Sequence, residues 1–496
     1  MKIKVLLLCI GFTGLFTSKI AAQIHRDSIV SEILHEKRYF RVSFPQGYDT
    51  ARQAKYDVLY VLDGESATDM ITEIQKHVQQ WGFAPPLIIV GVENNDRRRD
   101  LTPTQSGGSS GGAGAFLSYI TKELIPHINR AYHTSGSNSL FGHSYGGLFA
   151  LYALFTAPDT FDSYIAGDPS LWWDNGVMDT LARQKLPGVK GFKSLYLTSR
   201  SGNAYHDMGI DKMEAILRSS APPGLHWKTN QYDGETHVSA QFKSAYDGIK
   251  FSYTGYQNDT VTLIPMGGIA VKNQPFVVRY DEAFARTGYT TDGRIPGENS
   301  AIMKDTLTVN SPCKLTVSTL CFHSRFNHIS VANFAEGKAL PPVAPRKDWQ
   351  AGGLTYGYYP GNWNKLPGFG RLKPQHTGHV GIDIDIDSLH NDDHFALLVT
   401  GAIEIKADGY YTFVLSSDDA ASLYIGKQLL IRKAPGDNHD RSFMLPLKKG
   451  FYPLRFEYLH RAGTYSINLT WYTPENQTSI DPSSIPVAQL YTFKNH

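Results

Sequence analysis

The sequence predicts an α/β domain, with a mainly parallel sheet and helices on both faces, followed by two all-β domains. Between about residues 24 and 256, short apolar runs alternate with amphipathic stretches, as expected of helices that cover a parallel sheet. After residue 256 the helical periodicity ends, and short alternating runs with turn residues take over. A chain of 496 residues is also too long for one hydrophobic core.

The strands expected in the first domain are short apolar runs bounded by polar or turn-forming residues. A helix is expected over 116–132, directly after a loop at 106–115 that is rich in glycine and serine. This loop lacks the Lys-Ser/Thr ending of a phosphate-binding loop, so we interpret it as a linker or lid. The strands are expected at 38–44, 57–62, 87–92, 139–141, 163–165, 194–197 and 227–232.

The N-terminus has the pattern of a secretory signal peptide over residues 1–22. Lys2 and Lys4 precede an apolar run of about a dozen residues, and Ala21-Ala22 supplies the small residues of a cleavage site. The run is shorter than the roughly 20 residues that span a bilayer, and no later run is long enough. We expect a protein without transmembrane segments, exported to the periplasm, the outer surface or the medium.

The net charge of the chain argues against one class of partner, and the spacing of its cysteines argues against a disulfide. The formal net charge is +2, and removal of the signal peptide brings it close to neutral, which argues against nucleic acid as a partner. Cys313 and Cys321 lie in what reads as a single strand, so their α-carbons would be about 26 Å apart, beyond disulfide reach. We expect two buried thiols.

Gly142-His-Ser-Tyr-Gly-Gly147 is the most informative motif. It lies between an expected strand and an apolar helical run at 148–155, which is the context of a nucleophile elbow. The glycines permit the tight turn that lifts the Ser144 hydroxyl clear of the sheet. Ser144 is therefore the predicted nucleophile.

A serine nucleophile needs a base, and an imidazole suits that role near neutral pH. His237 directly follows the last expected strand of the domain, which is where a histidine can reach across the elbow. The backbone N–H of Tyr145 is one expected oxyanion donor, and the N–H of Glu65, after the strand that ends at Leu62, is the other. The alternative for the 63–64 segment is a plain turn.

Five motifs spread over residues 24–256 are characteristic when taken together. They are Tyr60-Val-Leu-Asp-Gly64, Arg97-Arg-Arg-Asp-Leu-Thr-Pro103, Gly142-His-Ser-Tyr-Gly-Gly147, Pro169-Ser-Leu-Trp-Trp-Asp174 and Gly234-Glu-Thr-His237. Through these motifs the domain resembles the esterase branch of the α/β-hydrolases, the group of esterase D and the enterobactin esterases. The resemblance implies an ester hydrolase in which Arg99 lines the site and Trp172 and Trp173 wall the substrate pocket.

The acid of a Ser-His-acid triad is the point at which the chain departs from that family pattern. Family members often carry a carboxylate soon after the strand at 194–197, but here the next residues are Thr198-Ser-Arg-Ser-Gly-Asn203. Asp207 is the first candidate and Asp211 the second. A Ser-His dyad without an acid is the alternative.

The two β-domains have resemblances of their own. Residues 260–338, through Gly288-Tyr-Thr-Thr-Asp-Gly293, resemble the β-sandwich at the C-terminus of chitobiase-type hexosaminidases, and a proline-rich linker follows at 339–352. Residues 353–492 resemble the protective-antigen module, through Gly353-Leu-Thr-Tyr-Gly-Tyr-Tyr359 and the strand that ends in Asp418-Asp419. In sugar-binding members such aspartates hold calcium, so Asp418 and Asp419 form either a calcium site or a structural turn.

The leading functional hypothesis is a secreted serine esterase, without a catalytic cofactor, that removes acyl groups from carbohydrates or related extracellular substrates. The carbohydrate part depends on the appended modules alone. The alternatives are a siderophore esterase that cleaves an enterobactin-type trilactone, a non-catalytic glycan-binding surface protein, and a peptidase.

Overall fold

The computed structural model describes residues 24–49, 54–280, 286–382, 394–437, 439–463 and 465–493. Its contacts divide the chain into two units, Met1–Asn258 and Asp259–His496. The predicted signal peptide at 1–22 lies outside the described residues. Within the described part, no helix is both long and apolar enough to cross a membrane.

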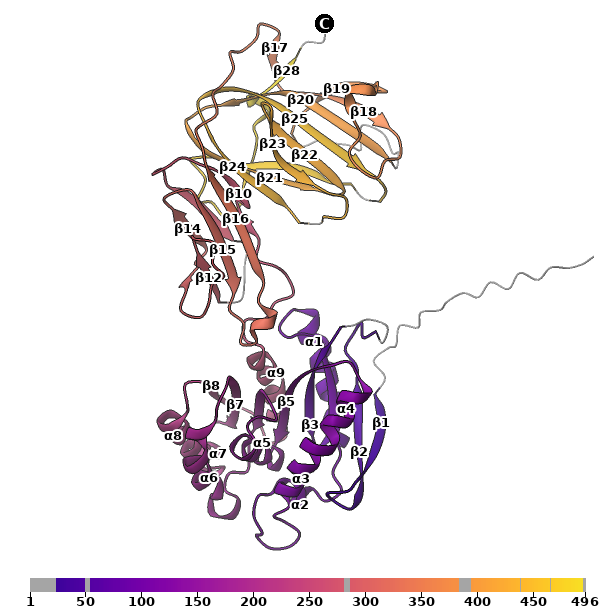
Figure 1. Cartoon of the computed structure of the whole chain (residues 1–496), viewed down its shortest axis with the longest axis vertical. Coiled ribbons are helices and arrows are strands. Elements are labelled where there is room, and N and C mark those ends of the chain that lie inside the picture. Colours follow the sequence, from indigo (N-terminus) through magenta and orange to yellow (C-terminus); the bar gives the residue numbers. More distant parts are fainter. Residues whose placement is uncertain are drawn as a thin grey trace, which may run out of the picture. The chain divides into compact units, whose positions relative to one another are not determined.

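An eight-stranded sheet, in the order β1-β2-β4-β3-β5-β6-β7-β8, forms the centre of the first unit (Figure 1). β1 and β2 are antiparallel to their neighbours, and the remaining strands run parallel. The carboxyl ends of β5, β6, β7 and β8 therefore open at one edge. The strands are β1 (His25–Ser31), β2 (Glu36–Ser43), β3 (Tyr56–Leu62), β4 (Leu87–Val92), β5 (Thr134–His143), β6 (Ser163–Gly167), β7 (Lys193–Arg200) and β8 (Leu225–Tyr232).

Helices connect the parallel strands, and buried hydrophobic side chains pack between the sheet and the helices. The connection before β5 is continuous but not uniform, because a π-helical turn at Ile120–Leu124 separates α3 from α4. The helices are α1 (Gly64–Gln80), α2 (Arg97–Leu101), α3 (Ala113–Tyr119), α4 (Ile125–Ala131), α5 (Tyr145–Thr156), α6 (Val177–Lys185), α7 (Asn203–Asp207), α8 (Ile210–Ser220) and α9 (Ala240–Ser252).

The second unit is built of β-strands. β10 (Gly267–Ala270) pairs with β16 (Ile329–Glu336) on one side and with β24 (Arg441–Leu447) on the other, so one nine-stranded sheet runs through both expected β-domains. The other strands used below are β15 (Cys313–Thr319), β18 (Leu354–Pro360), β19 (His376–Val380), β20 (Phe395–Ile405), β21 (Gly409–Ser417), β22 (Ala420–Ile425), β25 (Gly450–His460) and β26 (Ile467–Tyr472).

The remaining strands of the second unit are short or lie at sheet edges. They are β9 (Leu263–Ile264), β11 (Phe276–Tyr280), β12 (Thr287–Thr290), β13 (Ala301–Ile302), β14 (Thr306–Val309), β17 (Trp349–Ala351), β23 (Gln428–Lys433), β27 (Ser483–Ser484) and β28 (Leu490–Phe493).

The structure confirms the predicted fold class, an α/β domain followed by β-domains. The strand predicted at 87–92 has the same bounds in the structure, whereas β1 was not predicted as a strand. The single strand expected to hold both cysteines ends at Thr319, before Cys321. Neither Cys313 nor Cys321 forms a disulfide, both are only partly buried, and burial raises the pKa of each thiol.

Candidate functional site

Ser144 lies on a sharp turn between β5 and α5. Its backbone has φ 60° and ψ −116°, a strained conformation for a residue with a side chain. A Cβ at position 142 would lie 2.1 Å from the carbonyl oxygen of Gly146, so the turn closes only around glycine. Ser144 N–H donates to Gly167 O at 2.9 Å, and Ser144 Oγ lies 3.2 Å from Ser170 Oγ. The predicted nucleophile elbow thus has the expected geometry.

His237 lies in the loop after β8, and a buried carboxylate orients its ring. Its Nδ1 is 2.6 Å from Oδ2 of Asp168, whose side chain is fully buried. Asp168 is the first residue after β6, the neighbour of the strand that carries the elbow. The ring of His237 is about one-third exposed, so one side of the imidazole remains accessible from solvent.

Arg200, the last residue of β7, completes this cluster. Its Nε also donates to Oδ2 of Asp168 at 2.6 Å. Burial alone would raise the pKa of Asp168, but the hydrogen bonds from His237 and Arg200 outweigh it and hold that pKa below the ordinary value. The carboxylate is therefore ionised near neutral pH and can stabilise an imidazolium.

This geometry corrects the expectation that Asp207 orients His237. Asp207 is the last residue of the short helix α7, and Asp211 Oδ2 pairs with His206 Nδ1 at 2.9 Å. The carboxylate in contact with His237 directly follows β6, not β7. The signal was present in the sequence, because Asp168 follows an apolar strand directly and the carboxyl ends of neighbouring parallel strands meet at one edge.

His143 brings the elbow and the His237 loop together. The two imidazole rings lie 4.6 Å apart between centroids, and His143 directly precedes Ser144. Burial, and then the nearby His237, lower the pKa of His143 to about 4. Both nitrogens of the His143 ring are buried. The ring is a neutral wall against which His237 packs.

The expected oxyanion donors both lie in the first turn of a helix. Tyr145 is the first residue of α5, and Glu65 is the second residue of α1. The first N–H groups of a helix have no intrahelical acceptor and can bind an anion. Asp63, just before α1, has φ 56°, so the chain turns sharply between β3 and this helix.

Arg97 links this loop to the elbow. Its guanidinium binds both carboxylate oxygens of Asp63, at 2.7 and 2.9 Å, and Nη2 donates to His143 O at 3.3 Å. Its guanidinium carbon also lies 5.3 Å from the centre of the Tyr145 ring. Arg97 thereby connects the two segments that carry the predicted oxyanion donors.

Arg99, which was expected to line the site, is engaged elsewhere. Its guanidinium binds Asp100 Oδ1 at 2.7 Å and Glu36 Oε1 at 2.6 Å. Those two ion pairs raise its pKa further above the ordinary value. Arg97, two residues earlier, is the arginine in contact with the elbow, and residue spacing alone could not distinguish the two.

Trp172 and Trp173 form an aromatic cluster with Tyr145. The Tyr145 ring lies 6.2 Å from that of Trp172 and 5.5 Å from that of Trp173. Trp172 is 49% exposed, whereas Trp173 is buried and donates to Thr104 Oγ1 at 3.2 Å. Arg98 lies over Trp173, 5.1 Å from the ring centre. Aromatic and cationic groups thus adjoin the nucleophile.

Asp418 and Asp419, the predicted calcium ligands, lie at the turn between β21 and β22. Asp419 Oδ1 accepts from Arg461 Nε at 2.9 Å, and Oδ2 accepts from Arg461 N at 2.8 Å. A guanidinium therefore occupies the position next to Asp419 that a cation would need. Among the described residues, no three His, Cys, Asp or Glu side chains form a metal-binding group, and the calcium site stays a prediction.

Comparison with known proteins identifies two regions of the chain. Residues 31–209 match the family described as Putative esterase, and residues 351–484 match the PA14 domain. A siderophore enterobactin esterase of Emericella nidulans is 45% identical over 166 residues, covering 28% of this chain and 54% of the relative. Ferri-bacillibactin esterase BesA of Bacillus subtilis is 34% identical over 163 residues, covering 28% of this chain and 56% of the relative.

The chain therefore spans about half the length of these curated relatives. Among solved structures, an IroE-like serine hydrolase from Shewanella oneidensis has 33% sequence identity and a TM-score of 0.43, covering 46% of this chain and 79% of that one. The matches confirm that the first domain resembles the esterases and the last one the protective-antigen module.

Proposed function

We propose that the chain is an exported serine hydrolase that cleaves carboxylic esters. Ser144 is the nucleophile, His237 the general base, and Asp168 the residue that orients the base. The observation that carries this proposal is the contact between His237 Nδ1 and buried Asp168 Oδ2, beside a strained serine elbow. A buried carboxylate on Nδ1 fixes the tautomer that leaves Nε2 free to accept a proton.

The reaction has two steps, attack by Ser144 on the ester and release of the acid by water, and the same side chains act in both. Ser144 Oγ turns away from Ser170, gives its proton to Nε2 of His237 and attacks the ester carbonyl. A hydrogen bond between nucleophile and base often forms only when substrate is bound. The N–H groups of Tyr145 and Glu65 bind the oxyanion, and each such donor typically contributes 10²- to 10³-fold in rate. The imidazolium then protonates the leaving alcohol, and water releases the acid by the same route.

The substrate we propose is a siderophore-type ester with aromatic acyl groups. The named relatives of the first domain are siderophore esterases, which supports this choice over carbohydrate acyl groups. An electron-rich ring could stack on exposed Trp172 and on Tyr145. It could also form a cation–π contact with the guanidinium of Arg97, which lies close to Tyr145. The match of residues 351–484 to PA14 supports the second candidate, an acylated carbohydrate.

Hydrolysis assays test both parts of the proposal. Wild type and Ser144→Ala are compared on p-nitrophenyl acetate, where we expect the variant to lose activity. Equal rates would leave the chain a non-catalytic binding protein. A catecholate trilactone and acetylated or feruloylated sugars are then compared by kcat/KM, and a preference for the sugars would overturn the siderophore assignment.

A further inference from the structure

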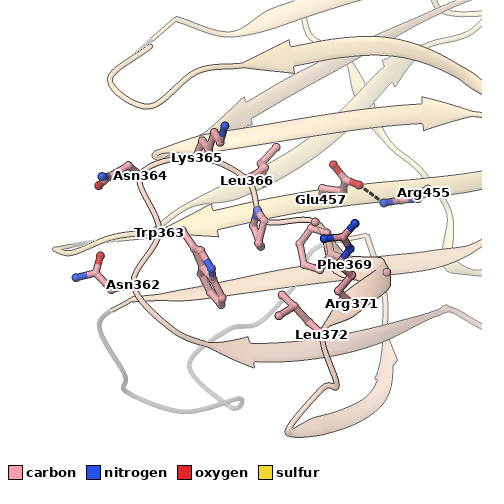
Figure 2. Close-up of a pocket in the computed structure, with 13 residues that line it drawn as sticks. Asn362, Trp363, Asn364, Lys365, Leu366, Phe369, Arg371, Leu372, Arg455 and Glu457 are labelled. Carbon is pink, nitrogen blue, oxygen red and sulfur yellow. Dashed lines mark hydrogen bonds and ion pairs between the residues drawn. The ribbon is translucent and has the colours of Figure 1, made fainter.

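The second unit contains a large open pocket that the proposed reaction does not use. The cavity, of about 970 Å³, lies between the 362–372 segment, which joins β18 to β19, and Arg455 and Glu457 of β25 (Figure 2). Buried Phe369 anchors the segment, packing edge-on against Tyr359 with ring centres 5.1 Å apart. The pocket wall is therefore fixed by packing against the sheet.

One side of the pocket is aromatic and the other is charged. Figure 2 shows the indole of half-buried Trp363 on one side, and the guanidinium of Arg371 near the Arg455–Glu457 ion pair on the other. The Glu457 side chain is only 9% exposed, and Arg455 neutralises it. Exposed Arg371 has no carboxylate partner among the described residues. With Lys365, the lining carries three cationic side chains and one carboxylate.

We propose that this pocket binds a carboxylated sugar residue, a hexuronic acid unit of an acidic polysaccharide. A pyranose ring has a flat apolar C–H face that matches the exposed face of an indole. The planar fork of a guanidinium matches a carboxylate through two parallel hydrogen bonds. Trp363 and Arg371 supply these two groups across one cavity, and the amides of Asn362 and Asn364 are available to hydroxyls.

This site is separate from the aspartate pair at the start of β22. Glu457 and Arg455 pair in register with Ser422 and Tyr424, on the face of the sheet that the 362–372 segment covers. The pocket has one carboxylate, already paired, whereas calcium prefers six to eight oxygen ligands. Binding in the pocket is therefore independent of calcium. It is also independent of Ser144, so this inference goes beyond the proposed reaction.

The test uses the full-length Ser144→Ala chain, so that hydrolysis cannot alter the ligand. Binding of polygalacturonate is measured by isothermal titration calorimetry, with EDTA present, and compared with the carboxyl-reduced polymer, a galactan with the same linkages. We expect polygalacturonate to bind at least tenfold more tightly than the galactan, and more weakly as salt rises. Equal affinities, or binding that EDTA abolishes, would overturn the proposal.

Two variants locate the site. Arg371→Gln should weaken polygalacturonate binding at least tenfold, because the guanidinium fork is lost. Arg294→Gln, an exposed arginine in the turn after β12, is the matched control and should leave the affinity unchanged. Trp363→Ala should weaken both polymers, provided that its circular dichroism matches that of the parent. If Arg371→Gln binds as the control does, the pocket is not the site, whatever the esterase assays show.

Discussion

Arg200 and His237 donate to the same oxygen of Asp168, each from 2.6 Å. The other oxygen, Oδ1, is buried without a partner among the described residues. Asp168 Oδ2 therefore accepts hydrogen bonds from both the His237 imidazole and the positively charged Arg200 guanidinium. The arginine is the last residue of β7, the strand after which the sequence analysis expected the acid.

Asp168→Asn should reduce kcat on p-nitrophenyl acetate by about 10³- to 10⁴-fold, because an amide can hold the wrong imidazole tautomer. The matched control is Asp207→Asn, at the end of α7, which should keep nearly full activity. The two variants are compared by steady-state kinetics at pH 8. Loss of activity in Asp207→Asn alone would restore the acid expected from the sequence.

Arg200→Gln should shift the acid limb of the pH–rate profile upward, by about one pH unit. The reaction needs ionised Asp168 beside His237, and Arg200 is one of the two hydrogen-bond donors that hold the pKa of Asp168 below its ordinary value. Without Arg200 the pKa of Asp168 rises, so activity is lost at a higher pH. Arg218→Gln, at an exposed arginine of α8 that pairs with Glu214, is the control and should not move the limb. An unshifted or lowered limb would contradict this role.

His143→Gln should make the stability of the protein less sensitive to acid. The folded state holds the pKa of His143 at about 4, below the 6.5 of an unperturbed histidine, so the unfolded chain binds the extra proton first. Stability is then lost as pH falls from 6.5 toward 4, by about 2 kcal/mol between pH 7 and pH 5. Urea unfolding of both proteins at the two pH values measures the difference. An equal loss in the variant would show that His143 is not the titrating group.

Gly142→Ala should destabilise the protein by about 3 kcal/mol or more, because its Cβ would overlap the Gly146 carbonyl. Gly188→Ala is the matched control, since nothing lies within 4 Å of a Cβ there. Thermal unfolding should separate the two variants clearly. If Gly142→Ala unfolds at the wild-type temperature, the elbow is less tightly closed than its geometry indicates.

The sequence was most informative where local rules decide the structure. The strand at 87–92 and the elbow at Ser144 follow from apolar runs and small residues close together in the chain. Asp168 could not be chosen in the same way, because its partner His237 is 69 residues away and only the sheet order brings them together. The same holds for Arg97 and Arg99, whose different partners depend on which side of α2 each one faces.

The β-region shows a similar limit. Alternating runs identify strands but not their neighbours, so the pairing of β10 with β24 across the proline-rich segment was not predictable from periodicity. Arg461, which binds Asp419, lies 42 residues from it. The sequence motif identified Asp418 and Asp419, but it could not identify Arg461 as the partner of Asp419.

Covalent labelling tests the central claim, that His237 activates Ser144, most directly. Wild type and His237→Gln are treated with a fluorophosphonate, and the modified peptide and its rate of formation are followed by mass spectrometry. We predict one phosphonylated residue, Ser144, and labelling at least 10³-fold slower in the variant. Labelling at another residue, or at an equal rate in both proteins, would contradict the account.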